Sequence, residues 1–167
     1  MSPVSPLSIL PMEQPSESAA VAAMMASSEP WRTLGRDAAV LQRAIEDPLR
    51  DAYAAHDDRG LAGALVLCLV GPFAGYIQTV FVASDRRGTG IGAQLVDFAE
   101  ARIFQSSPNA FLCVSAFNDG ARRLYERLGY QYVGELADFL VVGESELLYR
   151  KSRGSWTDFV PRLPCAP

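Results

Sequence analysis

Lysine is almost absent from this chain of 167 residues. Lys151 is the only one, and arginine supplies the other 14 of the 15 lysine and arginine residues. Acidic residues outnumber basic ones by 19 to 15, so the formal net charge is −4 and the pI is near 5.0. A protein that binds nucleic acid generally needs a broad basic surface. The composition therefore argues against nucleic acid as a partner.

Cysteine is scarce as well. The three cysteines, Cys68, Cys113 and Cys165, are odd in number and far apart in the chain. This pattern argues against a disulfide framework and against a zinc site, so we expect no metal. Because Cys68 and Cys113 stand in apolar runs, we expect both to be buried, reduced thiols.

The features of an exported or membrane protein are also missing. No arginine or lysine precedes Arg32, so the positively charged start of a signal peptide is lacking. No apolar run is long enough to span a bilayer. Apolar residues make up 49% of the chain and charged residues 20%, as is usual in globular proteins. We expect a soluble, cytoplasmic protein that does not bind membranes.

The spacing of apolar residues predicts a mixed α/β (α+β) sheet domain with helices on both faces. We place this single domain at 1–151 and a proline-containing tail at 152–167. A strand, a helix and a second strand between Tyr76 and Ala116 predict a parallel crossover. Strands are expected at 8–12, 49–55, 61–70, 76–82, 110–116, 130–136 and 144–151, and helices at 16–26 (with Ser16 as N-cap), 37–46, 90–105 and 119–128.

The most informative segment is Arg87-Gly88-Thr89-Gly90-Ile91-Gly92, between a predicted strand and a predicted helix. Glycine lets backbone N–H groups approach a phosphate closely, and a helix N-terminus favours its negative charge. Each glycine within a helical turn costs about 1 kcal/mol relative to alanine. A simple chain reversal would not need that cost repeated. The segment therefore predicts a phosphate-binding loop.

Two familiar nucleotide-binding loops fit this segment poorly. The loop of P-loop NTPases has a lysine beside its glycines, and none is present here. The dinucleotide fingerprint is matched formally by Gly88, Gly90 and Ala93. However, about half of the chain precedes this match, and the acidic residue expected at the end of the next strand is missing. A dinucleotide-binding oxidoreductase remains as an alternative.

Two blocks of the sequence together resemble the signature of the GNAT superfamily of N-acetyltransferases. Arg87, Gly90 and Gly92 fill its Arg/Gln-x-x-Gly-x-Gly/Ala pattern. Asn118–Tyr130 is similar to its Asn…Ala…Leu-Tyr…Leu-Gly-Phe/Tyr segment, and the two blocks lie within 76–151. The resemblance implies the acyl-CoA N-acyltransferase fold, with a central, mostly antiparallel sheet that contains one parallel, splayed pair of strands.

The resemblance also implies a reaction, the transfer of an acetyl group from acetyl-CoA to a primary amine by direct attack. It implies that Tyr125 is the general acid, and a phenol with a reference pKa of about 10 is suited to protonate a thiolate. The cofactor-binding residues that it implies are the strand residues Val80, Phe81 and Val82, the loop residues Arg87, Gly88, Thr89, Gly90, Ile91 and Gly92, and Asn118.

The general base and the acceptor stay open. The predicted cofactor-binding strand carries Gln78 and Thr79, neither of which can act as a base. Asp51, Glu135 and Asp138 are candidates elsewhere. A non-catalytic module that binds acyl-CoA as a sensor or assembly part is therefore a second alternative.

The sequence identifies few residues that could line the acceptor site. Trp31 is interpreted either as a wall of the acceptor site or as a hydrophobic anchor. A small amine, a polyamine-like molecule, an antibiotic and a peptide or protein amine all remain candidate acceptors. Trp156 and Phe159 are compatible with docking on the domain or on a second protomer, so a homodimer also stays open.

Overall fold

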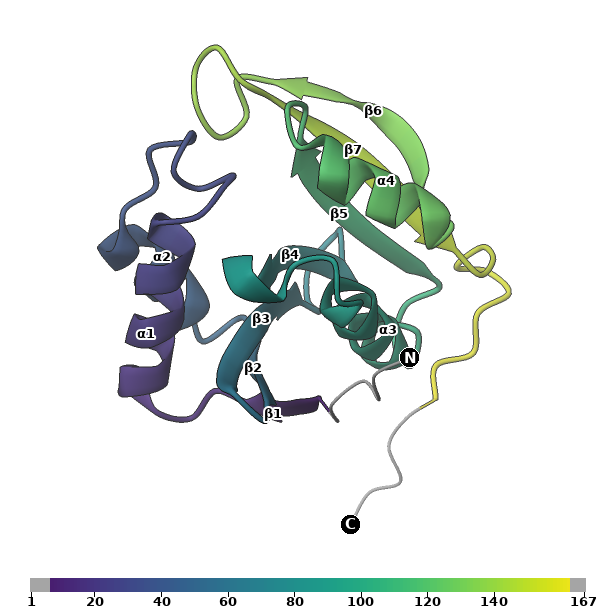
Figure 1. The fold of residues 1–167 in the computed structure, drawn as a ribbon. Helices are drawn as coiled ribbons and strands as arrows, with labels where there is room; N and C mark the ends of the chain where they lie inside the picture. The colour runs from purple at the N-terminus through teal and green to yellow at the C-terminus, as the bar shows by residue number, and fades with distance from the viewer. Residues whose placement is uncertain (1–6, 163–167) are drawn as a thin grey trace. The chain divides into compact units, whose positions relative to one another are not determined.

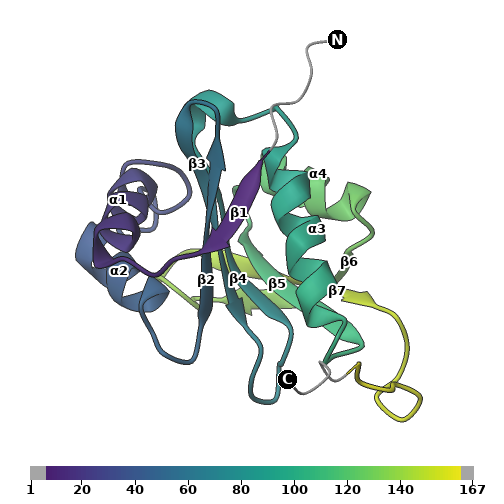
Figure 2. The ribbon, with the colours of Figure 1, turned by 90° about the horizontal axis from the view of Figure 1, so that it is seen from below.

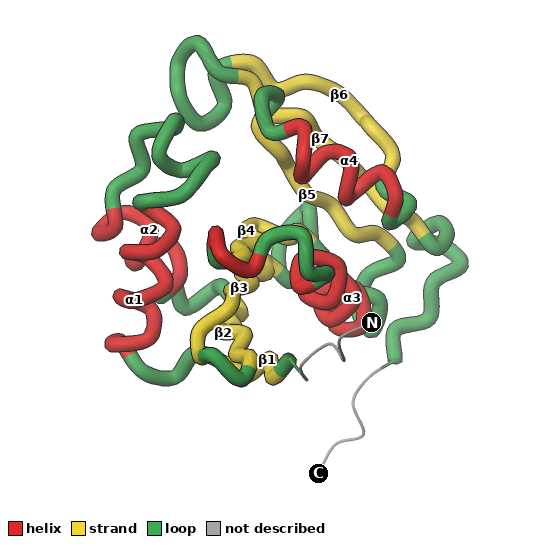
Figure 3. Tube along the Cα trace, viewed as in Figure 1, coloured by secondary structure: helices red, strands yellow, loops and turns green. Residues whose placement is uncertain are grey.

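The computed structural model describes residues 7–162, and within them it contains seven strands and four α-helices (Figures 1 and 3). In chain order these are β1 (Ser8–Pro11), α1 (Pro15–Ala26), α2 (Ala38–Ile45), β2 (Asp51–Asp57), β3 (Gly60–Cys68), β4 (Tyr76–Val82), a 3₁₀ turn (Ser84–Arg86), α3 (Ile91–Ile103), β5 (Asn109–Ser115), α4 (Asp119–Arg127), β6 (Gln131–Ala137) and β7 (Ser145–Ser152). The strand order in the sheet is β1-β2-β3-β4-β5-β7-β6.

The chain folds as two compact units. Among the described residues, the first comprises 7–66 together with Thr79–Val96, and the second comprises Leu67–Gln78 and 97–162. The strands β3 and β4 and the helix α3 each contribute to both units.

One parallel pair of strands stands among antiparallel ones. The start of β4 runs parallel to β5, with Tyr76 opposite Phe111 and Ile77 opposite Leu112. The pairs of β1 with β2, of β5 with β7 and of β6 with β7 are antiparallel. The parallel crossover predicted between Tyr76 and Ala116 is therefore confirmed.

In the first unit, helices cover both faces of β3. Ala64 and Val66 belong to a buried cluster with residues of α1 and α2, which lie together beside β2 and β3 in Figure 2. The residue before Ala64, Gly63, points to the other face, where a Cβ atom would lie 3.3 Å from Leu95 Cδ1 of α3. That Cβ would also lie 2.5 Å from the carbonyl oxygen of Phe81, so only glycine permits this approach of β3 to β4.

In the second unit, successive residues of β7 point to opposite faces of the sheet. On one face, Tyr149 Oη donates to Glu126 of α4 at 2.9 Å, and Lys151 Nζ donates to Glu100 of α3. The other face carries Glu146, whose Cα is opposite that of Ser115 on β5. The helices α3 and α4 therefore cover the face that carries Tyr149.

Several predicted details are wrong at the ends of elements. The helix α1 begins at Pro15, a residue favoured at the first helical position, so Ser16 lies inside the helix and Gln14 is the N-cap. The strand β2 runs on to Asp57, two residues beyond the predicted end at residue 55, and pairing with β1 places Ser8 opposite His56. Elsewhere the predicted boundaries lie within about two residues of the observed ones.

The cysteine prediction needs a similar correction. Cys68 and Cys113 are free thiols, as expected, but both are partly exposed rather than buried. Cys68 is the last residue of β3, where its Sγ donates to the carbonyl of Val70. Cys165 lies outside the described residues. No helix among residues 7–162 has the length and apolar character needed to cross a bilayer.

Candidate active site

The glycine loop of the first unit joins the end of β4 to the start of α3. Gly88 and Gly90 have φ angles of 77° and 89°, in the left-handed region that favours glycine. The first hydrogen bond of α3 runs from Gln94 N–H to the carbonyl of Gly90, at 3.2 Å. The amide groups of the first helical turn have no partner within their own helix, so they can bind an anion.

The same loop is open on its outer side. Gly88, Thr89 and Gly90 are exposed, and a Cβ atom at either glycine would have no atom within 4 Å. The glycines are therefore required by backbone conformation and not by crowding. Thr89 Oγ1 donates to the carbonyl of Arg86 at 2.6 Å, and this hydrogen bond joins the two ends of the turn from Arg86 to Thr89.

The arginine of the predicted signature supports the loop through backbone carbonyls. Arg87 Nη2 donates to the carbonyl of Glu29 at 3.0 Å, and Arg87 Nε donates to that of Val82 at 3.4 Å. Its side chain thus links the loop to the end of β4 and to the segment after α1. Because the Arg87 side chain is bonded to these carbonyls, the backbone amide is the group of Arg87 that can bind a ligand.

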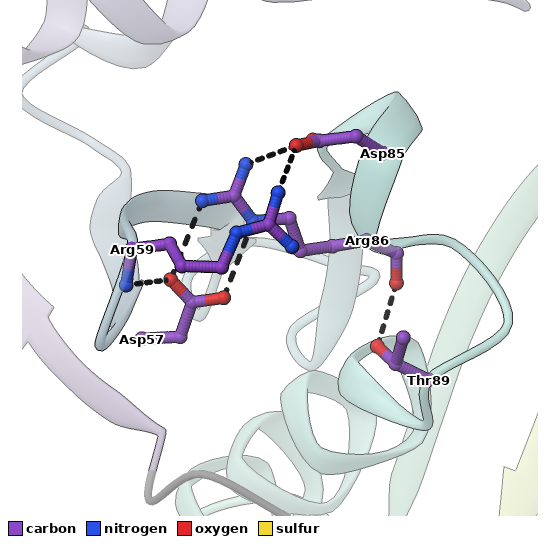
Figure 4. A network of polar contacts seen from close by, with 5 residues as sticks. All are labelled: Asp57, Arg59, Asp85, Arg86 and Thr89. Atoms are coloured by element: carbon purple, nitrogen blue, oxygen red, sulfur yellow. Dashed lines mark hydrogen bonds and ion pairs between the residues drawn. The ribbon is translucent and has the colours of Figure 1, made fainter.

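Arg86 is held by two carboxylates, as Figure 4 shows. Arg86 Nε lies 3.2 Å from Asp57 Oδ2, and Arg86 Nη1 lies 2.5 Å from Asp85 Oδ2. Arg59 Nη2 reaches the same oxygen of Asp85 at 2.7 Å. Hydrogen bonding to Arg86 holds the pKa of both Asp57 and Asp85 below the usual range. With its side chain only 12% exposed, Arg86 is a structural anchor of the loop.

The strand predicted to contact the cofactor, β4, carries Phe81 inward. Phe81 is fully buried, and its ring meets that of Trp31 edge-on with centroids 5.7 Å apart. Val80 and Val82 are partly exposed. This contact supports the anchor interpretation of Trp31.

In the second unit, the predicted residues of α4 lie at its start and on its buried side. Asn118 is the N-cap, and its side chain accepts a hydrogen bond from Ala121 N–H at 3.2 Å. Tyr125 is 7% exposed, and its ring packs edge-on against Tyr130 with centroids 6.0 Å apart. Among residues 7–162, no hydrogen-bond partner of the Tyr125 hydroxyl is present. Burial raises the pKa of Tyr125 above its ordinary value.

The acidic residues proposed as bases are either exposed or part of the loop structure. Asp51 and Glu135 are exposed. Asp138 has a φ angle of 55°, and its Oδ1 accepts from Gly143 N–H at 2.6 Å, so it shapes the loop before β7. The sequence interpretation missed Glu146, which is only 4% exposed. Glu146 and Leu147 are adjacent and both buried, so no alternation in the sequence of β7 marked the glutamate.

The fold is similar to that of solved acetyltransferases. An aminoglycoside 6′-N-acetyltransferase complexed with coenzyme A matches with a TM-score of 0.71 and 19% identity, over 93% of this chain and 98% of the other. Arabidopsis thaliana NAA60 in complex with a bisubstrate analogue matches with a TM-score of 0.70 and 20% identity, over 90% and 100%. The spermidine/spermine N-acetyltransferase SpeG from Vibrio cholerae matches with a TM-score of 0.67 and 15% identity, over 88% and 94%. No curated protein matches the sequence significantly.

The family model described as the acetyltransferase (GNAT) family matches residues 16–130. This match covers more than half of the chain and includes both blocks that carried the predicted resemblance. It confirms the predicted fold and the predicted class of enzyme, an acyltransferase. The match to a family of acetyltransferases also agrees with the predicted use of acetyl-CoA. The chain belongs to the acetyltransferase (GNAT) family.

Proposed function

We propose that this protein is an N-acetyltransferase that moves the acetyl group of acetyl-CoA to a primary amine by direct attack. The observation that carries the proposal is the open glycine loop. Gly88 and Gly90 are in the left-handed region and exposed, and they directly precede the first turn of α3. A pyrophosphate is the part of acetyl-CoA that suits such a loop.

The remaining contacts to the cofactor are assigned to backbone and cap groups. We assign the pyrophosphate to the amides of 87–92 and the pantetheine arm to the backbone of Val80–Val82. Asn118 is assigned to the pantetheine as well, although its side chain also caps α4. When bound, acetyl-CoA supplies an activated thioester whose carbonyl carbon an amine can attack.

Tyr125 is assigned the role of general acid. Its hydroxyl is free of partners among the described residues, so it can donate a hydrogen bond to a ligand atom. Because burial raises the pKa of Tyr125, the phenol keeps its proton at neutral pH. A thiolate leaving group can take that proton as the carbon–sulfur bond breaks.

The acceptor is assigned only to a class, the primary amines. Proteins of similar fold are named for aminoglycosides and for spermidine and spermine, both of which carry several amines. The net charge of −4 favours the approach of such cationic molecules. A peptide amine is the third member of the class to be tested.

The test combines a binding measurement with an activity measurement. Calorimetry with acetyl-CoA is expected to show saturable binding. Release of the CoA thiol is then followed with kanamycin, spermidine and a tetrapeptide with a free N-terminus, and at least one is expected to be acetylated. Absence of acetyl-CoA binding would overturn the proposal. Binding without turnover of any amine would favour the sensor or assembly module, which the lack of a carboxylate at Gln78 and Thr79 of β4 had suggested.

A further inference from the structure

Glu146 is a buried acid on β7 that the proposed function does not yet use. Glu146 is only 4% exposed, and its Oε1 accepts a hydrogen bond from Ser115 Oγ at 2.6 Å. Ser115, on the neighbouring strand β5, is itself only 3% exposed. Strand pairing places the two residues opposite each other, so the position of the carboxylate is determined by the sheet.

No cationic side chain neutralises this carboxylate within the part of the chain that the structure describes. The contrast with Glu100 is direct. Glu100 is 6% exposed, and both of its carboxylate oxygens accept from Lys151 Nζ, at 2.9 and 2.7 Å. A buried carboxylate without a cation is costly to keep. A cationic group from outside the chain would neutralise the Glu146 carboxylate.

The surroundings of Glu146 belong to one face of the second unit. Cys113 lies two residues before Ser115 on β5, so both side chains point to the same face. Burial raises the pKa of Tyr76 on β4 and of Cys113, and the nearby charge of Glu146 raises both further. Glu146 thus sits in a group of polar side chains at the parallel strand pair.

Tyr125 belongs to the opposite face. It lies on α4, and α4 is bonded to Tyr149 through Glu126. Tyr149 alternates with Leu148 and so points away from the face of Glu146. The proposed acid and the unused carboxylate therefore flank the sheet of this unit from its two sides. A reaction that removes a proton from one reactant and delivers a proton to another needs two such separate groups.

We propose that Glu146 is the general base that accepts a proton from the ammonium group of the acceptor. This inference rests on the proposed function. One of the three ammonium hydrogens passes to the Glu146 carboxylate, and the nitrogen lone pair then forms the bond to the acetyl carbon. The carbon–sulfur bond breaks, and Tyr125 gives its proton to the departing sulfur. The second hydrogen leaves the nitrogen and restores Tyr125, the third stays on the amide, and Glu146 later releases its proton to water.

The electrostatics of the site suit this role. Burial raises the pKa of the Glu146 carboxyl, the hydrogen bond from Ser115 lowers it, and the charge of Glu144 raises it. The other titratable groups that face it are Tyr76 from β4 and Cys113 from β5. The residue opposite Glu146 on β6 is Leu136, which carries no charge. A base whose pKa lies closer to neutral than that of an ordinary glutamate accepts a proton more effectively.

The test is the variant Glu146→Gln in the full chain, with Glu135→Gln as matched control. Glutamine keeps the size of the side chain and an oxygen that can accept from Ser115, whereas Glu135 is exposed on the neighbouring β6. With the amine that the wild-type protein acetylates best, Glu146→Gln is expected to lower kcat by about 10²–10⁴-fold. The affinity for acetyl-CoA by calorimetry and the melting temperature are expected to be retained, and Glu135→Gln is expected to behave like the wild type.

The pH profile separates a base from a mere binding contact. The kcat of the wild type is expected to rise with pH as Glu146 loses its proton, with an apparent pKa above the usual range of a glutamate, and this rise is expected to vanish in Glu146→Gln. A variant with unchanged kcat, or with a raised KM alone, would overturn the base role while leaving the acetyltransferase proposal intact. A wild-type protein that binds no acetyl-CoA would overturn the proposed function instead, and the base role with it.

Discussion

Lys151 on β7 donates to both carboxylate oxygens of Glu100 on α3, at 2.9 and 2.7 Å. It is the only lysine in the chain, and it forms an ion pair inside the second unit. The Glu100 side chain is 9% exposed and the Lys151 side chain 30%. The bond ties the helix that follows the glycine loop to the strand that carries Glu146.

Removing this ion pair is expected to destabilise the protein. Lys151→Met leaves the buried carboxylate of Glu100 without a partner, and we expect a loss of about 2–4 kcal/mol in the free energy of unfolding. Chemical denaturation measures it. The matched control is Arg32→Met, which breaks the exposed pair with Glu29 and is expected to change stability little. Equal losses in the two variants would contradict the assignment.

The left-handed glycine of the loop is expected to control cofactor affinity. Gly90→Ala adds a Cβ atom at a φ angle of 89°, where an ordinary residue is strained by about 1–2 kcal/mol. We expect acetyl-CoA to bind about tenfold more weakly, as measured by calorimetry. Gly60→Ala is the control, because Gly60, the first residue of β3, has a φ angle of 106° and equally open surroundings. The control is expected to lose stability but to keep its affinity, and a similar loss of affinity there would count against the phosphate-binding loop.

The proposed acid is tested by removing one oxygen atom. Tyr125→Phe is expected to lower kcat by about 10²-fold while leaving the affinity for acetyl-CoA unchanged. Because the hydroxyl has no hydrogen-bond partner among the described residues, the variant is expected to fold normally. Tyr132→Phe, on the exposed side of β6, is the control for the loss of a phenol. An active Tyr125→Phe enzyme would move the acid role to another group.

The network around Arg86 is expected to make stability depend on pH. The hydrogen bond to Arg86 lowers the pKa of Asp57 from its ordinary value of 3.8, so the folded state favours the charged carboxylate. This contribution is present above pH 3.8 and is lost as the pH falls through the lowered pKa. Asp57→Asn is therefore expected to reduce the melting temperature at pH 7 and to approach the wild type as the solution is made strongly acidic. Asp58→Asn, at the exposed neighbouring position, is expected to follow the wild type throughout.

Elements marked by local signals were predicted well. The strand Tyr76–Val82 was expected at its observed bounds, because β-branched and aromatic residues lie between two glycine-containing segments. The helix α4 begins after Asn118 and is followed by Gly129, whose φ angle of 90° suits the position after a helix. Strand ends were predicted less well. Pairing with β1 places Ser8 opposite His56, beyond the predicted end of β2 at residue 55, and this pairing joins residues that are far apart in the chain.

The sequence by itself determined the glycine loop, the α4 block and the family, because left-handed glycines, helix caps and helix starts are made by neighbours in the chain. Only the tertiary structure decided what the charged residues do. Arg86 meets Asp57, and Ser115 meets Glu146, across 29 and 31 positions. Burial and pairing of this kind depend on which strands lie side by side, and a local pattern does not contain that information. For the same reason, the three acids considered first were exposed or structural, while the buried carboxylate of Glu146 emerged from the fold.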